Sequence, residues 1–205
     1  MPVSRYLVPA GTHRVTEEVK RSRFITTLAR ASGIPEAQAF VQQMRDEFPD
    51  ATHHCWAYVV GPPATTAQIG MSDDGEPHGT AGPSMLNALL HADVGDVVAV
   101  VTRFYGGRNL GTGGLVRAYG SGVVRALETL PRVERIEFVN LSVAVDYAKV
   151  SGLEQLFPSF EVLVDDRRFD ADVTFDLRLP DMQVAGFRTA VLDLTRGQAR
   201  FGHDG

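Results

Sequence analysis

Five glycines and three arginines lie around the end of an apolar segment near the middle of the chain. The glycines are Gly106, Gly107, Gly111, Gly113 and Gly114. Arg103 precedes them, Arg108 lies among them and Arg117 follows them. Guanidinium groups and the free backbone N–H groups at a helix start both bind phosphate. This glycine segment predicts an anion site, which Arg125 on the following helix could extend; alternatively, the glycines only permit a tight strand-to-helix connection.

The glycine segment does not match the common nucleotide-binding motifs. No Gly-Lys-Ser/Thr triplet closes it, as a P-loop requires. The dinucleotide pattern Gly-x-Gly-x-x-Gly fails because Val116 stands where a third glycine should follow Gly111 and Gly113. The chain also lacks Gly-x-Ser-x-Gly, His-Glu-x-x-His and aromatic-basic RNA-recognition patterns. These absences argue against hydrolases with a nucleophile elbow, zinc proteases and RNA-recognition-motif proteins.

An acidic loop is the second candidate for chemistry. It carries Asp73, Asp74, Glu76 and His78 within six residues. Such a group could hold a hard cation or perform acid–base catalysis, and Asp74, Glu76 and His78 are the candidate catalytic residues. The spacing of a calcium loop is absent, so we predict no metal site and no cofactor. The carboxylates could equally form turns or cap a helix, and Asp73 or Asp74 could hold an arginine of the glycine segment.

The third candidate is the run His53-His54-Cys55. On a strand, His53 and Cys55 would share one face. A catalytic thiol would need an imidazole within hydrogen-bond reach, whereas an isolated cysteine usually behaves as a small buried hydrophobe. Because Cys55 is the single cysteine, the chain can form neither an internal disulfide nor a multi-cysteine zinc site.

The hydrophobic pattern outlines the elements that must position these residues. Apolar, β-branched runs predict strands, and apolar residues three and four apart predict helices. Predicted strands cover residues 23–28, 52–60, 64–72 and the run that begins at 97, and predicted helices cover 32–48, 84–91 and 115–130. Pro131 follows the last helix and suits a domain boundary. We therefore expect two domains, at residues 1–130 and 131–205.

The second domain is predicted to alternate strands and helices. The expected strands are residues 135–146, 161–167, 171–179 and 198–201, and the expected helices are residues 147–156 and the segment that follows Asp181. The resulting order, strand-helix-strand-strand-helix-strand, is that of the ferredoxin-like split βαβ fold. The fold class is accordingly α+β.

Bulk composition is that of an ordinary soluble protein, with 44% hydrophobic and 22% charged residues. No apolar run approaches the ~18 residues that a membrane span needs, and the first twenty residues do not resemble a signal peptide. We expect a cytoplasmic protein without membrane contact. The formal net charge of −5 is opposite to the basic excess of most nucleic-acid binders, so nucleic-acid binding would require a local basic patch.

Several motifs together resemble the IMPACT/YigZ family in its bacterial two-domain form. They are the run from Lys20 to Ile25, the segment His54–Tyr58, the acidic loop from Ser72 to Gly82 and the long run from Val101 to Tyr119. The resemblance covers roughly residues 12–128, and the part from residue 135 resembles the extra domain of bacterial members. One departure is Arg108-Asn109, where an aliphatic residue followed by lysine is common.

The resemblance implies a first domain like domain 2 of ribosomal protein S5, followed by a ferredoxin-like domain. It also implies contact with nucleic acid or the ribosome and a role in regulating translation or the stress response, without an established reaction.

Three hypotheses about function follow. The first is a non-enzymatic protein that binds RNA or the ribosome through Arg103, Arg108, Arg117 and Arg125. The second is an enzyme that acts on a small anionic or phosphate-bearing substrate between the acidic loop and the glycine segment. The third is a regulator that contacts a protein partner through the C-terminal domain.

Overall fold

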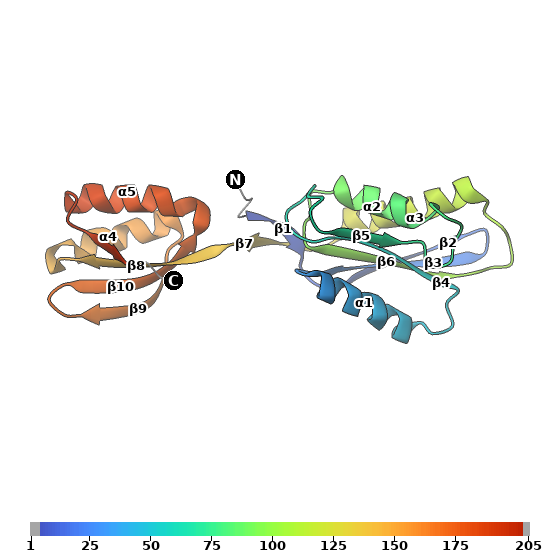
Figure 1. Cartoon of the computed structure of the whole chain (residues 1–205), viewed down its shortest axis with the longest axis horizontal. Helices are drawn as coiled ribbons and strands as arrows, with labels where there is room; N and C mark the ends of the chain where they lie inside the picture. The colour runs from blue at the N-terminus through green and yellow to red at the C-terminus, as the bar shows by residue number, and fades with distance from the viewer. Residues whose placement is uncertain (1–4, 203–205) are drawn as a thin grey trace. The chain divides into compact units, whose positions relative to one another are not determined.

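The chain folds into two α+β domains. The computed structural model describes residues 5–202 (Figure 1). The N-terminal domain comprises Tyr6–Arg135, and the C-terminal domain contains the described residues from Ile136 onward together with Arg5. We predicted the division after Leu130, whereas the structure divides the chain after Arg135. The difference arises because β7 (Arg132–Ile136) pairs with β1 (Arg5–Pro9).

A five-stranded antiparallel sheet forms the centre of the N-terminal domain. Its order is β2-β3-β6-β4-β5. The strands are β2 (His13–Val19), β3 (Ser22–Arg30), β4 (His53–Val59), β5 (Ile69–Ser72) and β6 (Val97–Phe104). The central strand β6 is apolar without alternation from Val97 to Val101, and all five of these residues are fully buried. Such a run fits a strand that is covered on both faces.

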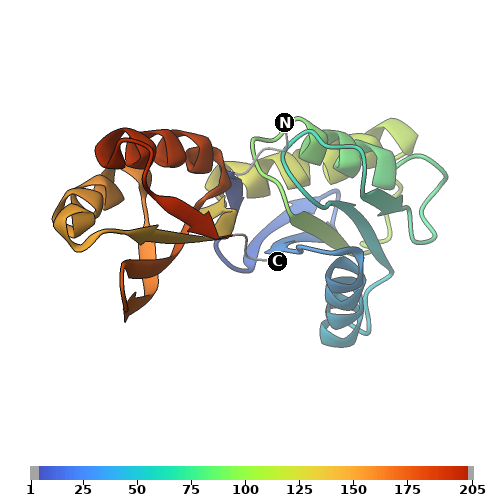
Figure 2. The same ribbon diagram turned by 60° about the vertical axis from the view of Figure 1, so that its left-hand side comes forward.

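Three helices cover the two faces of this sheet (Figures 1 and 2). They are α1 (Ile34–Glu47), α2 (Gly82–Leu90) and α3 (Thr112–Thr129). The helix α1 lies alone on one face, where Phe40, Val41 and Met44 pack against Val98 and Val100. Helices α2 and α3 lie together on the other face and enclose the larger core. The apolar spacing predicted all three helices, within a few residues at their ends.

A buried carboxylate joins the short β1–β7 pair to the rest of the N-terminal domain. Asp96 is fully buried and accepts hydrogen bonds from the Gly61 N–H at 2.8 Å and the Tyr6 hydroxyl at 2.9 Å. It also forms an ion pair with Arg135 of β7. Burial, followed by the contact with Asp96, raises the pKa of Tyr6 to about 12. The prediction of one strand over residues 135–146 was wrong, because the chain leaves β7 at Ile136 and begins a new strand at Phe138.

The C-terminal domain is a four-stranded antiparallel sheet with two helices on one face (Figure 1). The elements are β8 (Phe138–Val145), α4 (Val150–Leu156), β9 (Leu163–Phe169), β10 (Val173–Pro180), α5 (Val184–Thr195) and β11 (Arg200–Gly202). The sheet order β11-β8-β10-β9 places the first and third strands of this domain side by side at its centre. The predicted element order is confirmed. The two helices pack on the sheet residues Val143, Phe175 and Leu177, α4 through Leu153 and α5 through Phe187 and Val191.

Candidate functional site

The first carboxylate of the acidic loop stabilises the start of α2. The Asp73 carboxylate accepts hydrogen bonds from the N–H groups of Gly79 at 2.7 Å, Ala81 at 2.9 Å and Gly82 at 2.8 Å. Burial raises the pKa of Asp73, but these three donors outweigh burial and the pKa is lowered overall. Asp73 therefore has the helix-capping role that was left open for the carboxylates of this loop.

The three candidate catalytic residues of the loop do not form one site. Asp74 bonds the Arg45 guanidinium at 2.8 Å and the His54 N–H at 2.6 Å, so both of its oxygens are occupied. The His78 side chain is fully exposed and lies 3.9 Å from Asp73. Only Glu76 lies inside the domain, with a side chain that is 3% exposed.

Glu76 and Arg103 form a buried ion pair between the acidic loop and the end of β6. One Glu76 oxygen, Oε1, accepts hydrogen bonds from Arg103 Nη1 at 2.5 Å and from the Tyr119 hydroxyl at 2.7 Å. The Arg103 side chain is only 6% exposed, and its guanidinium lies 5.4 Å from the ring centroids of both Phe24 and Tyr105. The sequence predicted Arg103 as part of an exposed anion site, but the structure places it beneath the surface and neutralises it with Glu76.

Two further groups surround this pair. His53 lies with Nε2 at 4.0 Å from Glu76 Oε1, while its Nδ1 is 2.8 Å from the Asp74 carbonyl oxygen. Burial raises the pKa of Tyr119, and the neighbouring Cys55 and Glu76 groups raise it further. The cluster connects the acidic loop, β4, β6 and α3. This arrangement is expected of a buried polar network that holds these four elements together.

Cys55 is fully buried next to this cluster, and its Sγ donates a hydrogen bond to the Asp73 carbonyl oxygen at 2.9 Å. Burial raises the pKa of the thiol to about 12. Since the thiolate is the reactive form, we expect native protein to resist a chromogenic disulfide reagent at mildly alkaline pH. In denaturant the same reagent should titrate one thiol per chain. Rapid labelling of the native protein would contradict this placement of Cys55.

The glycine segment connects β6 to α3 and is exposed for most of its length. Gly107 and Gly111 have φ angles of 77° and 75°, which other residues rarely adopt. Gly106 packs directly on the β2–β3 turn, since a Cβ atom there would lie 2.0 Å from the Arg21 carbonyl oxygen. Gly113 and Gly114 belong to the first turn of α3. The glycines therefore serve chain geometry, and they also leave the backbone at the start of α3 uncovered by side chains.

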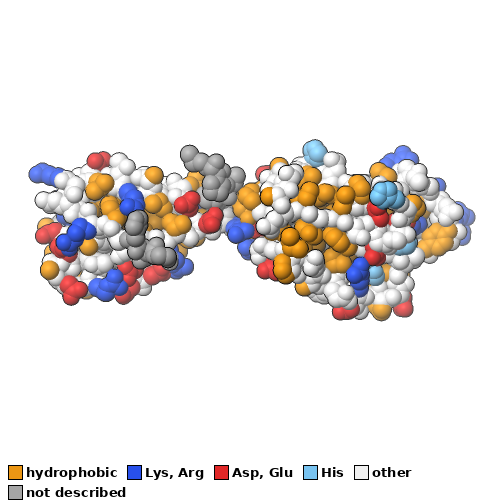
Figure 3. Space-filling model, in the orientation of Figure 1, with side chains coloured by type: hydrophobic (Ala, Val, Ile, Leu, Met, Phe, Trp, Pro, Cys, Tyr) orange, Lys and Arg blue, Asp and Glu red, His pale blue; other side chains and the backbone are white. Residues whose placement is uncertain are grey.

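Exposed cations gather around the glycine segment at one end of the N-terminal domain. We name this group the basic end, and it consists of Lys20, Arg21, Arg23, Arg108 and Arg117. Figure 3 shows blue side chains grouped at the right-hand end of this domain. Within residues 5–202, none of the five forms an ion pair with a carboxylate. Glu18 is the register partner of Arg23 across β2 and β3, and the Arg23 guanidinium lies over the Phe104 ring at 4.1 Å.

The structure thus brings together some residues of the predicted anion site and places the others elsewhere or in ion pairs. Arg108 and Arg117 lie with the five glycines at the basic end, whereas Arg103 is buried and Arg125 forms an ion pair with Glu17. Sequence reasoning missed the cations of the β2–β3 turn as members of this surface. Their run, Lys20-Arg21-Ser22-Arg23, was visible, but nothing local indicated that it packs on Gly106.

The arginines of the C-terminal domain are arranged differently. Arg168 pairs with Asp176, Arg178 pairs with Asp165 at 2.6 Å, and Arg200 pairs with Asp172. Arg167 pairs with Glu154 of α4. This domain therefore neutralises much of its basic surface internally.

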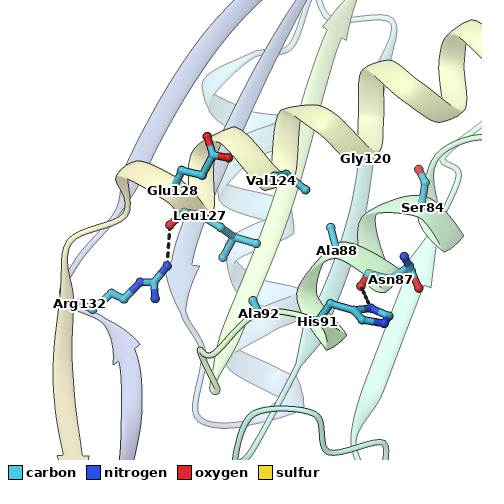
Figure 4. A pocket seen from close by; sticks show the side chains of 10 residues that line it. All are labelled: Ser84, Asn87, Ala88, His91, Ala92, Gly120, Val124, Leu127, Glu128 and Arg132. Atoms are coloured by element: carbon cyan, nitrogen blue, oxygen red, sulfur yellow. Dashed lines mark hydrogen bonds between the residues drawn. The ribbon is translucent and has the colours of Figure 1, made fainter.

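A groove of about 480 Å³ runs between α2 and α3 on the outer face of the helices (Figure 4). Its floor is formed by small and apolar residues, namely Ala88, Ala92, Gly120, Val124 and Leu127. At the rim, the His91 Nδ1 is 2.8 Å from the Asn87 carbonyl oxygen, and Arg132 donates to the Leu127 carbonyl oxygen at 2.8 Å. The two charged residues that line the groove, Glu128 and Arg132, have opposite signs, so the groove does not resemble an anion site.

The described residues show neither a membrane-spanning helix nor a metal-binding cluster. In residues 5–202, no helix is both long and apolar enough to cross a membrane. The same residues contain no group of three or more histidine, cysteine or carboxylate side chains that could hold a metal ion.

Comparison with known proteins identifies both domains. The family model for the Impact N-terminal domain matches residues 20–127, and the model described as a domain of unknown function, DUF1949, matches residues 143–198. The chain is 44% identical over 192 residues to "IMPACT family member YigZ" of Escherichia coli K12, covering 94% of both chains. It is 40% identical over 196 residues to an "IMPACT family member" of Haemophilus influenzae, covering 96% of this chain and 95% of that protein.

A solved structure shares the same fold. The crystal structure of a protein described as hypothetical is 41% identical, with a TM-score of 0.69 over 100% of this chain and 98% of that chain. The resemblance noted in the sequence is confirmed, and the chain belongs to the IMPACT family.

Proposed function

We propose that this protein is a non-enzymatic RNA-binding protein that holds the phosphate backbone at the basic end. The observation that carries the proposal is the meeting of the β2–β3 turn with the glycine segment, which places at one end of the N-terminal domain five exposed cations that form no ion pair within residues 5–202. Arginine and lysine at a surface that also exposes backbone N–H groups suit phosphate oxygens.

An exposed aromatic ring lies beside these cations. The Tyr105 side chain is 48% exposed, and its hydroxyl donates to Asn109 Oδ1 at 3.0 Å. Single-stranded nucleic acids bind to grooves in which cations follow the backbone and aromatic rings stack on bases. The combination favours single-stranded RNA over a duplex.

The overall charge of −5 does not conflict with this proposal. In water containing salt, charges separated by more than about 10 Å are largely screened, so a bound strand responds mainly to the cations next to it. The acidic residues of the C-terminal domain are extensively paired with arginines of the same domain. The local charge of the basic end therefore decides the binding.

Further parts of the proposal rest on family membership. We propose that the RNA contact serves translation, through the ribosome, in the cytoplasm. We also assign the N-terminal domain to the folds that resemble domain 2 of ribosomal protein S5. The sheet order β11-β8-β10-β9 supports the ferredoxin-like name for the C-terminal domain.

The enzyme hypothesis has less support. Asp74 is tied to Arg45 and His54, while Glu76 is bonded to Arg103 and Tyr119. A general base must be able to reach the proton that it removes, and these carboxylates are engaged in holding the fold. Among the described residues, the carboxylate nearest to the exposed His78 is Asp73, at 3.9 Å. The docking of a protein partner on the C-terminal domain stays a prediction.

Binding of a labelled single-stranded RNA tests the proposal. For the variant Lys20→Ala/Arg21→Ala/Arg108→Ala, we expect affinity to fall roughly tenfold or more, because each lost phosphate contact removes one counterion-release contribution. The slope of log K against log salt, measured by fluorescence anisotropy between about 50 and 200 mM salt, should flatten by about 0.7 per cation removed.

Arg30→Ala is the matched control for that experiment. Arg30 is exposed and ends β3, whereas the β2–β3 turn precedes the start of the same strand. Its removal should leave affinity and salt slope unchanged. Absence of binding at micromolar protein, salt-independent binding, or equal losses in the control and the triple variant would reject the proposal.

A further inference from the structure

We propose that a small cavity between α1 and the β5 edge of the N-terminal sheet binds a single nucleobase. The cavity has a volume of about 210 Å³ and is lined by Gln38, Val41, Arg45, Trp56, Tyr58 and Ser72. It lies on the α1 face of the sheet, whereas the glycine segment leads into α3 on the opposite face. The inference therefore stands independently of the proposed function.

Two parallel aromatic rings form one side of this cavity. Trp56 and Tyr58 are alternate residues of β4, so both point to the α1 face. Their ring centroids are 5.7 Å apart and the ring planes differ by only 6°. Offset, parallel stacking of this kind is the arrangement that aromatic rings prefer, and a further flat ring can continue it.

The position of Tyr58 is set by the neighbouring strand. Gly70 on β5 is its register partner, and a Cβ atom at Gly70 would lie 2.5 Å from the Tyr58 ring. The phenol ring thus lies directly against the bare backbone of β5. Tyr58 is 6% exposed, while Trp56 is half-buried at the edge of the core. The fixed tyrosine supports the indole, and the indole is the ring that remains accessible to a ligand.

The polar side chains around the cavity suit the edge of a base. Gln38, one helical turn before Val41 on α1, offers an amide donor and acceptor, and within residues 5–202 this amide forms no hydrogen bond. Ser72 accepts a hydrogen bond from the Asp74 N–H at 3.1 Å, which leaves the Ser72 hydroxyl hydrogen free to donate. Nucleobases present donors and acceptors along one edge, and amide and hydroxyl groups can pair with such an edge.

Charge and size favour a base over a phosphate or a whole nucleotide. Among the described residues that line the cavity, Arg45 is the only cation, and it is already paired with Asp74 at 2.8 Å. Pockets for drug-sized ligands hold about 300–1,000 Å³, so a cavity of about 210 Å³ suits one flat heterocycle. The shared chemistry is a nucleobase, supplied either by a free nucleoside or by a single-stranded nucleic acid.

Trp56 allows a direct test because it is the only tryptophan in the chain. Its indole N–H gives a single resonance in a nitrogen–proton correlation spectrum. Titration with adenosine, guanosine, cytidine or uridine should shift this resonance in a saturable way, with a dissociation constant of about 1 mM or below. Ribose alone should leave it in place. A short single-stranded RNA and its fully abasic counterpart form the second arm.

The outcomes separate the two sources of the base. A shift with a nucleoside indicates a free-nucleoside site, and a shift only with the RNA that carries bases indicates a base presented by nucleic acid. Gln38→Ala should raise the dissociation constant measured from either shift at least threefold. Gln42→Ala should leave this constant unchanged, because the wild-type Gln42 amide already bonds Asp46 at 2.8 Å. No shift with any nucleoside or RNA, or equal effects of both variants, would overturn the inference. Because the readout is the indole, failure here is distinct from loss of RNA affinity at the basic end.

Discussion

Arg103→Ala is expected to lower the free energy of unfolding by about 3–5 kcal/mol, because it leaves the buried Glu76 carboxylate without its cation. The Glu76 and Arg103 side chains are 3% and 6% exposed, so water cannot replace the lost partner. Tyr119 would remain as a single donor to Glu76. Urea denaturation monitored by circular dichroism measures the change. The loss of unfolding free energy should be large enough to lower the urea concentration at the unfolding midpoint markedly.

Two further variants show whether the pair itself is responsible. Glu76→Gln/Arg103→Met removes both charges while keeping similar volumes, and we expect it to recover much of the loss, since replacing a buried pair costs far less than breaking it. Arg108→Ala removes an exposed arginine of the same segment and should change stability by no more than about 0.5 kcal/mol. If Arg103→Ala lowered the free energy of unfolding no more than Arg108→Ala, the Glu76–Arg103 pair would not stabilise the domain as the structure indicates.

Asp96→Ala is expected to destabilise the N-terminal domain by about 3 kcal/mol. The substitution removes the acceptor of the Gly61 N–H and the Tyr6 hydroxyl and leaves Arg135 without its carboxylate. We set the value at the lower end of the range for a broken buried pair because the Arg135 side chain is 35% exposed and water can partly solvate it. Thermal unfolding measures the total effect.

Hydrogen exchange locates the damage caused by Asp96→Ala. Relative to the wild type, the substitution should accelerate exchange of the β1 and β7 amides more than exchange of the β6 amides. The reason is that Asp96 links Tyr6 and Arg135 to the rest of the domain. Asp93→Ala serves as the control, because Asp93 is exposed and precedes the same strand. Uniform acceleration across the whole sheet, or an Asp93→Ala variant that is equally damaged, would contradict the local role of Asp96.

Regular elements with strong periodicity were predictable from the sequence. The uninterrupted apolar run that begins at Val97 predicted a strand, and β6 is the buried central strand of the sheet. The spacing of Phe40, Val41 and Met44 predicted α1 and its buried face. In both cases neighbouring residues carry the information, so a local pattern was sufficient.

Partners that lie far apart in the chain were not predictable in the same way. The sequence indicated that Asp73 or Asp74 could hold an arginine of the glycine segment, whereas in the structure Glu76 is the carboxylate that pairs with Arg103. Which carboxylate turns inward depends on the loop backbone, where Asp74 and Gly75 both have positive φ angles. The meeting of Gly106 with Arg21 depends on the pairing of β3 with β6, and no local signal marks it.

The pairing of β1 with β7 also has a consequence for the modular construction of this chain. The strand that enters the N-terminal domain and the strand that leaves it are hydrogen-bonded neighbours. The two ends of the domain therefore lie next to each other. Segments with adjacent ends tolerate transplantation into a host polypeptide. Residues 6–135 therefore form a cassette that could be inserted into a surface loop of an unrelated carrier protein, or joined to a different second domain, without stretching either junction.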